Sequence, residues 1–154
     1  MSQGVDAKAR QIDIHASTVM AGEAGILIRG ASGSGKSGMA LALIGLVTAQ
    51  MRPARLVADD RTCLEVRHGR LIASCKPAVA GLIERRGLGL VPMPHEPRVI
   101  VRLVVDCLGR EPERMPEAED LVTELLGLTL PRIAIHGRSE DAGLVQAALE
   151  LFTR

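Results

Sequence analysis

The sequence is poor in aromatic residues: its 154 residues include no tryptophan, no tyrosine and a single phenylalanine, Phe152. Proteins that bind single-stranded nucleic acid stack the bases on aromatic side chains, and such side chains are lacking here. The formal net charge is only +1, which is too small for the basic surface that duplex DNA requires. We therefore expect no nucleic-acid partner and a core of aliphatic side chains.

Cysteine is also scarce, and no stretch of the chain is apolar for long enough to cross a bilayer. The three cysteines are Cys63, Cys75 and Cys107, and their odd number and spacing fit neither a disulfide framework nor a zinc site. The first residues, MSQGVDAKARQID, hold no apolar run of the kind found in signal peptides. These absences predict a cytoplasmic protein with no membrane partner.

The length of the chain predicts one domain. Residues 1–11 are polar, and we expect them to form a flexible lead. Residues 12–154 mix strand and helix patterns with several hairpin signals, which predicts an α/β fold with a mixed sheet. The segment 81–97 is rich in glycine and proline, and no element is assigned to it.

Hydrophobic patterns and turn residues place the individual elements. One hairpin is expected around Gly22–Gly25 and another around His68–Gly69. Helices are expected over 36–50, over 117–127 with Gly127 as the stop, and from Ser139 onward with that serine as the N-cap.

A glycine-rich segment indicates phosphate binding. GASGSGKS, residues 30–37, fits the pattern G-x-x-x-x-G-K-[ST], with a predicted strand before it and a predicted helix after it. Its glycines let backbone N–H groups converge on a phosphate, and the start of the helix adds its positive end. Lys36 supplies a mobile cation, and Ser37 supplies a hydroxyl for Mg²⁺. The expected nucleotide-binding residues are Gly30, Ala31, Ser32, Gly33, Ser34, Gly35, Lys36 and Ser37.

Two adjacent acids, Asp59 and Asp60, end the next predicted strand in the sequence LVADD. In phosphate-loop enzymes an acid at this place holds Mg²⁺ or its water. Two acids allow one carboxylate to stay by the metal while the other accepts the proton of an attacking hydroxyl. The pattern itself leaves open which acid does which.

A third segment, IERRGLGLV at 83–91, carries a family resemblance. It resembles the EIRGLGI signature of the HPr kinase/phosphorylase family, and it follows His15, GASGSGKS and LVADD in the order that the family shows. The resemblance runs from His15 to the last predicted helix. It implies a phosphate-loop kinase core similar to that of phosphoenolpyruvate carboxykinases, in a shortened form without the separate N-terminal domain that family members usually carry.

The resemblance also implies an activity. Members of this family use ATP and Mg²⁺ to phosphorylate a serine of HPr, the small phosphocarrier of the sugar phosphotransferase system. Many also remove that phosphate by phosphorolysis, which consumes inorganic phosphate and releases pyrophosphate. They usually form hexamers. We therefore expect an HPr-like phosphocarrier as partner, ATP and Mg²⁺ as cofactors, and a homo-oligomer.

Site roles follow from the same resemblance, one residue at a time. It implies that Lys36 contacts the β- and γ-phosphates, and that Asp60 is the base in phosphorylation and the acid in dephosphorylation. His15 belongs to the catalytic set, and Arg114 joins it from the context PERMP where the family has ERLG. The implied metal ligands are Ser37, Asp59 and Glu84, and the implied substrate and phosphate contacts are Arg86, Gly87, Gly89 and Arg138.

Two segments depart from the family pattern. The one between RGLGLV and the last predicted strand is compressed and rich in proline, and the other differs in its residues. The family's VRPGRN, which is tied to phosphorolysis, reads IAIHGRSE here. Gly137 and Arg138 remain, but His136 stands where the family has a proline that stiffens the turn. This departure predicts a phosphorylase activity that is weaker relative to the kinase activity than in typical members.

Two other functions fit the same phosphate loop. A small-molecule kinase would share the loop, but it would also need a lid and a substrate pocket, which the sequence does not identify. A nucleotide-binding sensor without catalysis would keep Lys36 and Ser37 but would need no acid such as Asp60. The presence of both Asp60 and Glu84 disfavours a pure sensor.

Overall fold

The computed structural model describes residues 10–153. The predicted flexible lead over 1–11 therefore lies outside the described residues except for its last two, and of these Gln11 already belongs to a strand. Within the described part of the chain, neither helix has the length and hydropathy that would be needed to cross a bilayer.

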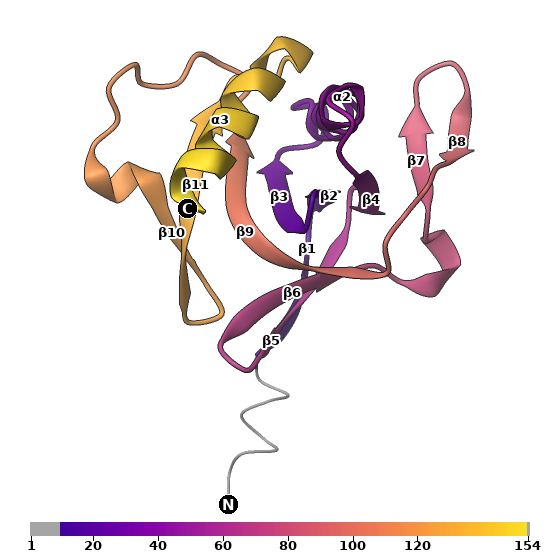
Figure 1. The fold of residues 1–154 in the computed structure, drawn as a ribbon, viewed down its shortest axis with the longest axis horizontal. Coiled ribbons are helices and arrows are strands. Elements are labelled where there is room, and N and C mark those ends of the chain that lie inside the picture. Colours follow the sequence, from indigo (N-terminus) through magenta and orange to yellow (C-terminus); the bar gives the residue numbers. More distant parts are fainter. Residues whose placement is uncertain (1–9, 154) are drawn as a thin grey trace, which may run out of the picture.

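A large mixed sheet with two helices on one side makes up the molecule (Figure 1), which confirms the predicted α/β class. The strands are β1 (Gln11–Ile14), β2 (Ala16–Ala21), β3 (Ala24–Gly30), β4 (Ala54–Ala58), β5 (Thr62–Arg67), β6 (Arg70–Ser74), β7 (Leu82–Arg85), β8 (Gly89–Pro92), β9 (Arg98–Cys107), β10 (Val122–Leu125) and β11 (Leu128–Ile135). The helices are α2 (Lys36–Ala49) and α3 (Ala142–Phe152), with 3-10 turns η1 (Pro77–Val79), η2 (Ala118–Leu121) and η3 (Ser139–Asp141).

Strand β9 organises the sheet because it pairs with three neighbours. Its first residues pair antiparallel with β6, and its last residues pair in parallel with β3 on one side and β11 on the other. Strand β2 runs antiparallel to β3, and β4 runs antiparallel to β2. Consequently β3, β4, β9 and β11 all point to one edge of the sheet, the edge at which ligands of open α/β sheets bind (Figure 1).

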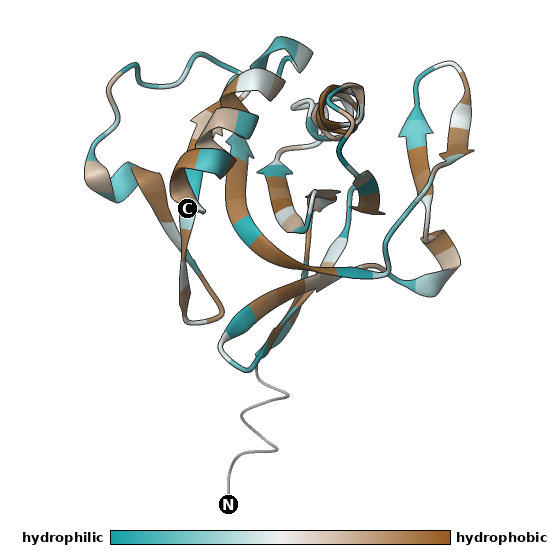
Figure 2. Ribbon diagram, in the orientation of Figure 1, coloured by the Kyte–Doolittle hydropathy of each residue, from teal (hydrophilic) through white to brown (hydrophobic). Residues whose placement is uncertain are grey.

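Aliphatic side chains cover both faces of the sheet. On β3, Ile26 and Ile28 pack with residues of α2 and α3, whereas Leu27 packs on the opposite face with residues of β5 and β6. All three side chains are fully buried, and a strand buried on both faces requires an uninterrupted apolar run such as ILI. Figure 2 shows hydrophobic stretches in brown on α2 and on the strands beneath it, interrupted by hydrophilic stretches in teal.

Both predicted hairpins and the first predicted helix are confirmed. Strands β2 and β3 pair around a turn at Gly22, and β5 and β6 pair around His68 and Gly69. His68 and Gly69 have φ of 51° and 73°, as expected for the two-residue turn that matches the twist of a hairpin. The unassigned segment 81–97 forms a separate hairpin of β7 and β8.

The prediction of a helix over 117–127 is wrong. Only η2 is helical there, and the residues after it form the antiparallel hairpin of β10 and β11. Leu126 and Gly127 make its turn with φ of 50° and 82°, so the glycine closes a hairpin instead of a helix. The β-branched pair Val122 and Thr123 favours a strand, and pairing with β11 decides the outcome.

The prediction of Ser139 as a helix N-cap is also wrong. Ser139 opens η3, and the N-cap of α3 is Asp141. The Oδ2 atom of Asp141 accepts hydrogen bonds from the N–H groups of Gly137 and Arg138, both at 3.0 Å. The carboxylate therefore orders the turn between β11 and α3.

A partly buried ion network joins three adjacent strands near the same edge of the sheet. Asp106 on β9 accepts hydrogen bonds from Arg29 on β3 at 2.7 and 2.8 Å and from Arg132 on β11 at 2.7 Å. Burial by itself raises the pKa of Asp106, but the hydrogen bonds and positive charges of the two arginines outweigh burial and hold its pKa below the usual 3.8.

Replacing Asp106 with asparagine should lower the free energy of unfolding at neutral pH by about 1.5–3 kcal/mol, because two arginines lose a charged acceptor. The folded-state pKa lies below the unfolded-state pKa, so this stabilisation is complete above the unfolded value of 3.8 and is lost as the pH falls through the folded value. Urea unfolding at about pH 7 and pH 3 should show a gap between wild type and Asp106→Asn that narrows at low pH. The control is Glu150→Gln on the exposed side of α3, and a pH-independent gap would contradict the prediction.

Candidate active site

The phosphate loop leaves the carboxyl end of β3 and leads directly into α2. Gly30 is the last residue of β3 and Lys36 is the first of α2, so the predicted strand, loop and helix are all present. The Lys36 side chain is only 5% exposed, and its Nζ donates to the carbonyl oxygens of Gly30 at 3.0 Å and Ala31 at 3.1 Å. An anion in the loop would offer this ammonium a stronger partner than two neutral carbonyls.

The loop packs against the turn that follows β11, with no space between the two backbones. Gly35 and Gly137 have φ of 100° and 115°, a region that favours glycine. A Cβ on Gly35 would lie 2.2 Å from the carbonyl oxygen of Gly137, and a Cβ on Gly137 would lie 2.2 Å from that of Ser34. The turn that carries Arg138 is thus a wall of the phosphate loop.

Asp59 is the centre of a polar network at the end of β4. Its Oδ1 accepts hydrogen bonds from the hydroxyls of Ser37 at 2.6 Å and Ser17 at 2.9 Å, and its Oδ2 accepts one from the N–H of Glu84 at 3.1 Å. The three donors come from α2, β2 and β7. The structure therefore brings together the predicted metal ligands Ser37 and Asp59 through their side chains, and Glu84 through its backbone.

Asp60 is held differently, although it is the next residue. Its φ of 64° is left-handed, a conformation that costs a non-glycine residue about 1–3 kcal/mol unless its surroundings hold it there. Its N–H donates to Ser17 Oγ at 3.0 Å, and its carbonyl accepts from the N–H of Ala16 at 3.1 Å. The side chain is 67% exposed, with Oδ1 3.9 Å from Lys36 Nζ. Asp59 is thus enclosed, while Asp60 faces solvent beside the loop.

His15 lies at the rim of this site. It is exposed, it precedes Ala16, and its Nε2 lies 3.4 Å from Nη2 of Arg61. Arg61 itself follows the two acids in the chain. The structure therefore places His15 near Asp60 without a direct contact between the two side chains among the described residues.

The β7–β8 hairpin lies beside α2 and β4 (Figure 1), and the N–H of Glu84 in β7 donates to Asp59 Oδ2. Buried Ile83 anchors it to the core, whereas Arg86, Gly87 and Gly89 lie at its exposed tip. Two apolar side chains at the tip, those of Leu88 and Leu90, are 71% and 65% exposed. The predicted substrate-contacting glycines thus belong to a projecting turn.

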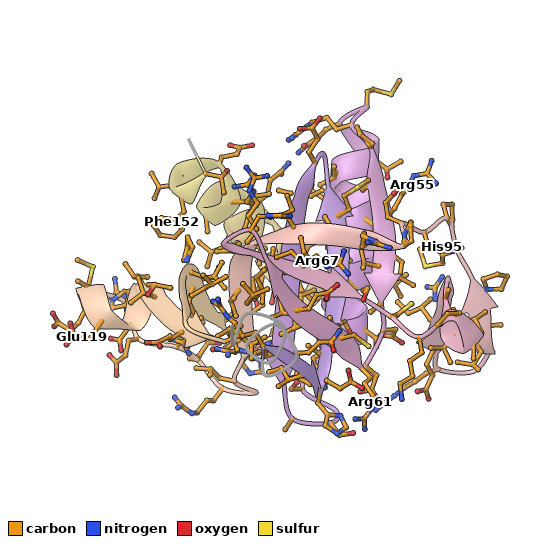
Figure 3. The ribbon with its side chains drawn as sticks, turned by 90° about the horizontal axis from the view of Figure 1, so that it is seen from below. Arg55, Arg61, Arg67, His95, Glu119 and Phe152 are labelled. Carbon is orange, nitrogen blue, oxygen red and sulfur yellow. The ribbon has the colours of Figure 1, made fainter. Side chains whose placement is uncertain are left out.

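Arg114 lies elsewhere in the chain. It lines a cavity of about 570 Å³ between the loop 108–117, β11 and α3. Figure 3 places Glu119, in η2 just after this loop, on the opposite side of the molecule from His95, which contacts Gly81 at the start of the β7–β8 segment. Among residues 10–153, no hydrogen bond or ion pair joins Arg114 to the phosphate loop or the acids, and its catalytic role stays a prediction.

Sequence reasoning missed Ser17 and Asp141. The first contacts both predicted acids, and the second holds the turn against which the phosphate loop packs. A faint signal for Ser17 exists, since Ser17 and Thr18 interrupt an otherwise apolar strand. The buried polar residues of the described chain are Ser17, Thr18, Lys36 and Thr62, which lie in or directly behind the site.

The donor set fits Mg²⁺ and phosphate. Hydroxyl and carboxylate oxygens are the ligands that Mg²⁺ prefers, and Ser37, Asp59 and Asp60 supply them. Within residues 10–153 no three His, Cys, Asp or Glu side chains form a metal cluster. Ser34 Oγ is buried without a hydrogen-bond partner among the described residues, and it offers the loop a further donor.

Residues 6–96 match the family model of the HPr Serine kinase C-terminal domain, which is more than half of the chain. The chain belongs to this family. The matched residues include the phosphate loop, both acids and the RGLGL segment, but they end before Arg114 and Arg138.

Known relatives agree with this assignment. The HPr kinase/phosphorylase of Geobacillus thermodenitrificans is 36% identical over an alignment of 127 positions, which covers 72% of this chain and 38% of that protein. The HPr kinase/phosphorylase of Clostridium tetani is 46% identical over 70 residues, which are 46% of this chain and 21% of that protein. The chain therefore matches well under half the length of these relatives. The structure of the Hpr(Ser) kinase/phosphatase from Coxiella burnetii has a TM-score of 0.72 at 26% identity, covering 91% of this chain and 95% of that one.

The contact between the two turns is tested by Gly137→Ala. The added Cβ meets Ser34 O, so we expect a loss of about 1–3 kcal/mol in stability, with a Tm that falls by about 2–4 °C per kcal/mol. Gly143→Ala in α3 is the matched control, because a Cβ there meets nothing within 4 Å. Its Tm should stay level or rise. Equal thermal unfolding curves for the two variants would contradict the tight contact.

Proposed function

We propose that residues 12–154 form the catalytic domain of a Mg·ATP-dependent serine kinase that acts on an HPr-like phosphocarrier. The observation that carries this proposal is the unlike environment of two adjacent acids beside a phosphate loop. Asp59 is enclosed by three donors, and Asp60 is exposed 3.9 Å from the loop lysine. A nucleotide sensor would need no exposed carboxylate at this place. Membership of the HPr serine kinase C-terminal domain family supports the same reading.

The proposed reaction uses each part of the site once. The serine hydroxyl of the substrate attacks the γ-phosphorus of ATP, the new O–P bond forms, and the bond to the β–γ bridging oxygen breaks to release ADP. The serine proton passes to Asp60, whose exposure lets a protein substrate reach it. Lys36 neutralises charge on the β- and γ-oxygens, and Ser37 and Asp59 would hold Mg²⁺, which would supply further positive charge there.

A protein substrate fits the exposed side of this site. The tip of the β7–β8 hairpin presents Arg86 together with exposed Leu88 and Leu90 next to the acids, as a docking surface for another protein would. The small-molecule kinase remains the alternative, and it would require a pocket that closes over Asp60. The predicted homo-oligomer, a hexamer as the resemblance implies, and the cytoplasmic location stay predictions. Light scattering of the purified chain decides the first of these.

The decisive experiment combines the protein with γ-labelled ATP, Mg²⁺ and a purified HPr-like phosphocarrier. We expect label on a serine of the phosphocarrier, and Lys36→Ala should lower the rate by about 10²–10³ because charge on the phosphate oxygens loses its partner. Lys76→Ala is the control, since that lysine pairs with Asp13 outside the site. Label that passes to a small-molecule acceptor added to a parallel mixture, but not to the phosphocarrier, would indicate a small-molecule kinase, and binding without turnover would indicate a sensor.

Phosphorolysis is proposed as the second activity. An oxygen of inorganic phosphate attacks the phosphorus of phosphoserine, and the new O–P bond makes pyrophosphate. The bond from that phosphorus to the serine oxygen breaks, and protonated Asp60 gives its proton to this oxygen. Arg138, on the wall of the phosphate loop, is positioned to hold the attacking phosphate, but its Nη1 donates to Glu111 Oε1 at 2.9 Å. This pairing, together with His136 in place of proline, supports our proposal that the reverse reaction is weak.

Glu111→Gln should therefore raise pyrophosphate release from the phosphoserine protein by a few-fold while leaving the forward rate unchanged, because Arg138 loses a competing carboxylate. Glu113→Gln is the control, because it removes the same charge from the same loop and Glu113 makes no ion pair within residues 10–153. Pyrophosphate release in wild type is expected to be slower than the forward reaction. A reverse rate equal to the forward rate, unchanged by Glu111→Gln, would show that this pairing does not limit phosphorolysis.

A further inference from the structure

Ser17 contacts both acids of the site although it is neither a phosphate-loop residue nor a charged one. Its Oγ donates to Asp59 Oδ1 at 2.9 Å and accepts from the N–H of Asp60 at 3.0 Å. The side chain of Ser17 on β2 is fully buried, so solvent water does not reach its hydroxyl. One oxygen atom therefore fixes the carboxylate of the first acid and the backbone of the second.

A β-bulge creates this arrangement. Residues 19–21 of β2 pair with residues 54–56 of β4 in one register, but Thr18 pairs with Ala58, so Val57 is an extra residue in β4. If the pairing of Thr18 with Ala58 is continued by one residue along each antiparallel strand, Ser17 lies opposite Asp59. Without the bulge Ser17 would lie opposite Ala58, and the Asp59 side chain would point to the other face of the sheet, away from α2 and Ser37.

A second pair of buried hydroxyls holds β2 in this position from the opposite face. Thr18 Oγ1 lies 2.9 Å from Thr62 Oγ1, which donates to the carbonyl of Ala16 at 2.8 Å. The N–H of Ala16 in turn donates to the carbonyl of Asp60. Asp60 is thus held in its left-handed conformation at its N–H by Ser17 and at its carbonyl by Ala16.

We propose that Ser17 is a positioning residue that sets the division of labour between the two acids. By donating to Asp59, it aims that carboxylate at the metal together with Ser37. By accepting from the N–H of Asp60, it turns the second carboxylate toward solvent and the substrate hydroxyl. The claimed effect of Ser17 on Asp60 and on catalysis rests on the proposed kinase function. The claimed effect on Asp59 and on metal binding rests on the hydrogen-bond network alone.

The test compares Ser17→Ala with Ser17→Thr, which keeps a hydroxyl. Ser17→Ala should lower kcat by about 10–100-fold and weaken Mn²⁺ binding in the presence of ADP to a similar extent, as other residues that orient metal ligands do. ADP affinity in EDTA should be unchanged, since the phosphate loop keeps its contacts. Ser17→Thr, checked for folding by its Tm, should recover both kcat and Mn²⁺ affinity.

Thr18→Val is the matched control, because it removes the neighbouring buried hydroxyl on the opposite face of the same strand. It should lower the Tm while Mn²⁺ affinity stays at the wild-type value. The proposal is overturned if Ser17→Ala keeps wild-type kcat and Mn²⁺ affinity, or if Thr18→Val reproduces the same losses. If the wild-type protein transfers no label to the HPr-like phosphocarrier, the proposed function fails. The Mn²⁺·ADP titration still decides the role of Ser17.

Discussion

The parallel alignment of β3 with β9 is the constraint on which the site depends. Because these strands point the same way, the phosphate loop after β3 and the residues after β9 emerge at one edge of the sheet. Parallel pairing of β9 with β11 brings the Gly137 turn to that edge, and β2 brings β4 and its two acids there as well. Segments distant in sequence therefore meet at the phosphate loop, and each arrives with its backbone already ordered by the sheet.

The acids show how a fold gives two identical side chains different chemistry. Asp59 and Asp60 are neighbours in the chain, yet one is enclosed by donors and the other lies open beside a buried lysine. The difference arises in the backbone, because the left-handed turn at Asp60 sends its side chain away from that of Asp59. Holding such a turn costs free energy, and buried hydroxyls on β2 and β5 offset that cost.

Local chemistry could be predicted from the sequence, whereas pairing between distant segments could not. The phosphate loop carries its own turn residues and is flanked by a strand and a helix of clear pattern, so GASGSGKS and its neighbours were placed correctly. The segment 117–127 has a helix-compatible composition, and only pairing with β11 makes it a strand. Ser17 was missed for the same reason, since its importance depends on a bulge between β2 and β4 that a single strand's pattern does not reveal.

The contact between Gly35 and Gly137 also shows that the segment matched by the family model is smaller than the segment that has to fold together. The family match ends at residue 96, but the backbone against which the phosphate loop rests belongs to a turn some forty residues further on. A fragment cut at the end of the match would keep every residue of the loop and lose its wall. The portion most easily recognised by comparison is therefore not a portable module, and any chimera or shortened version of this domain has to carry β11 and the start of α3 with it.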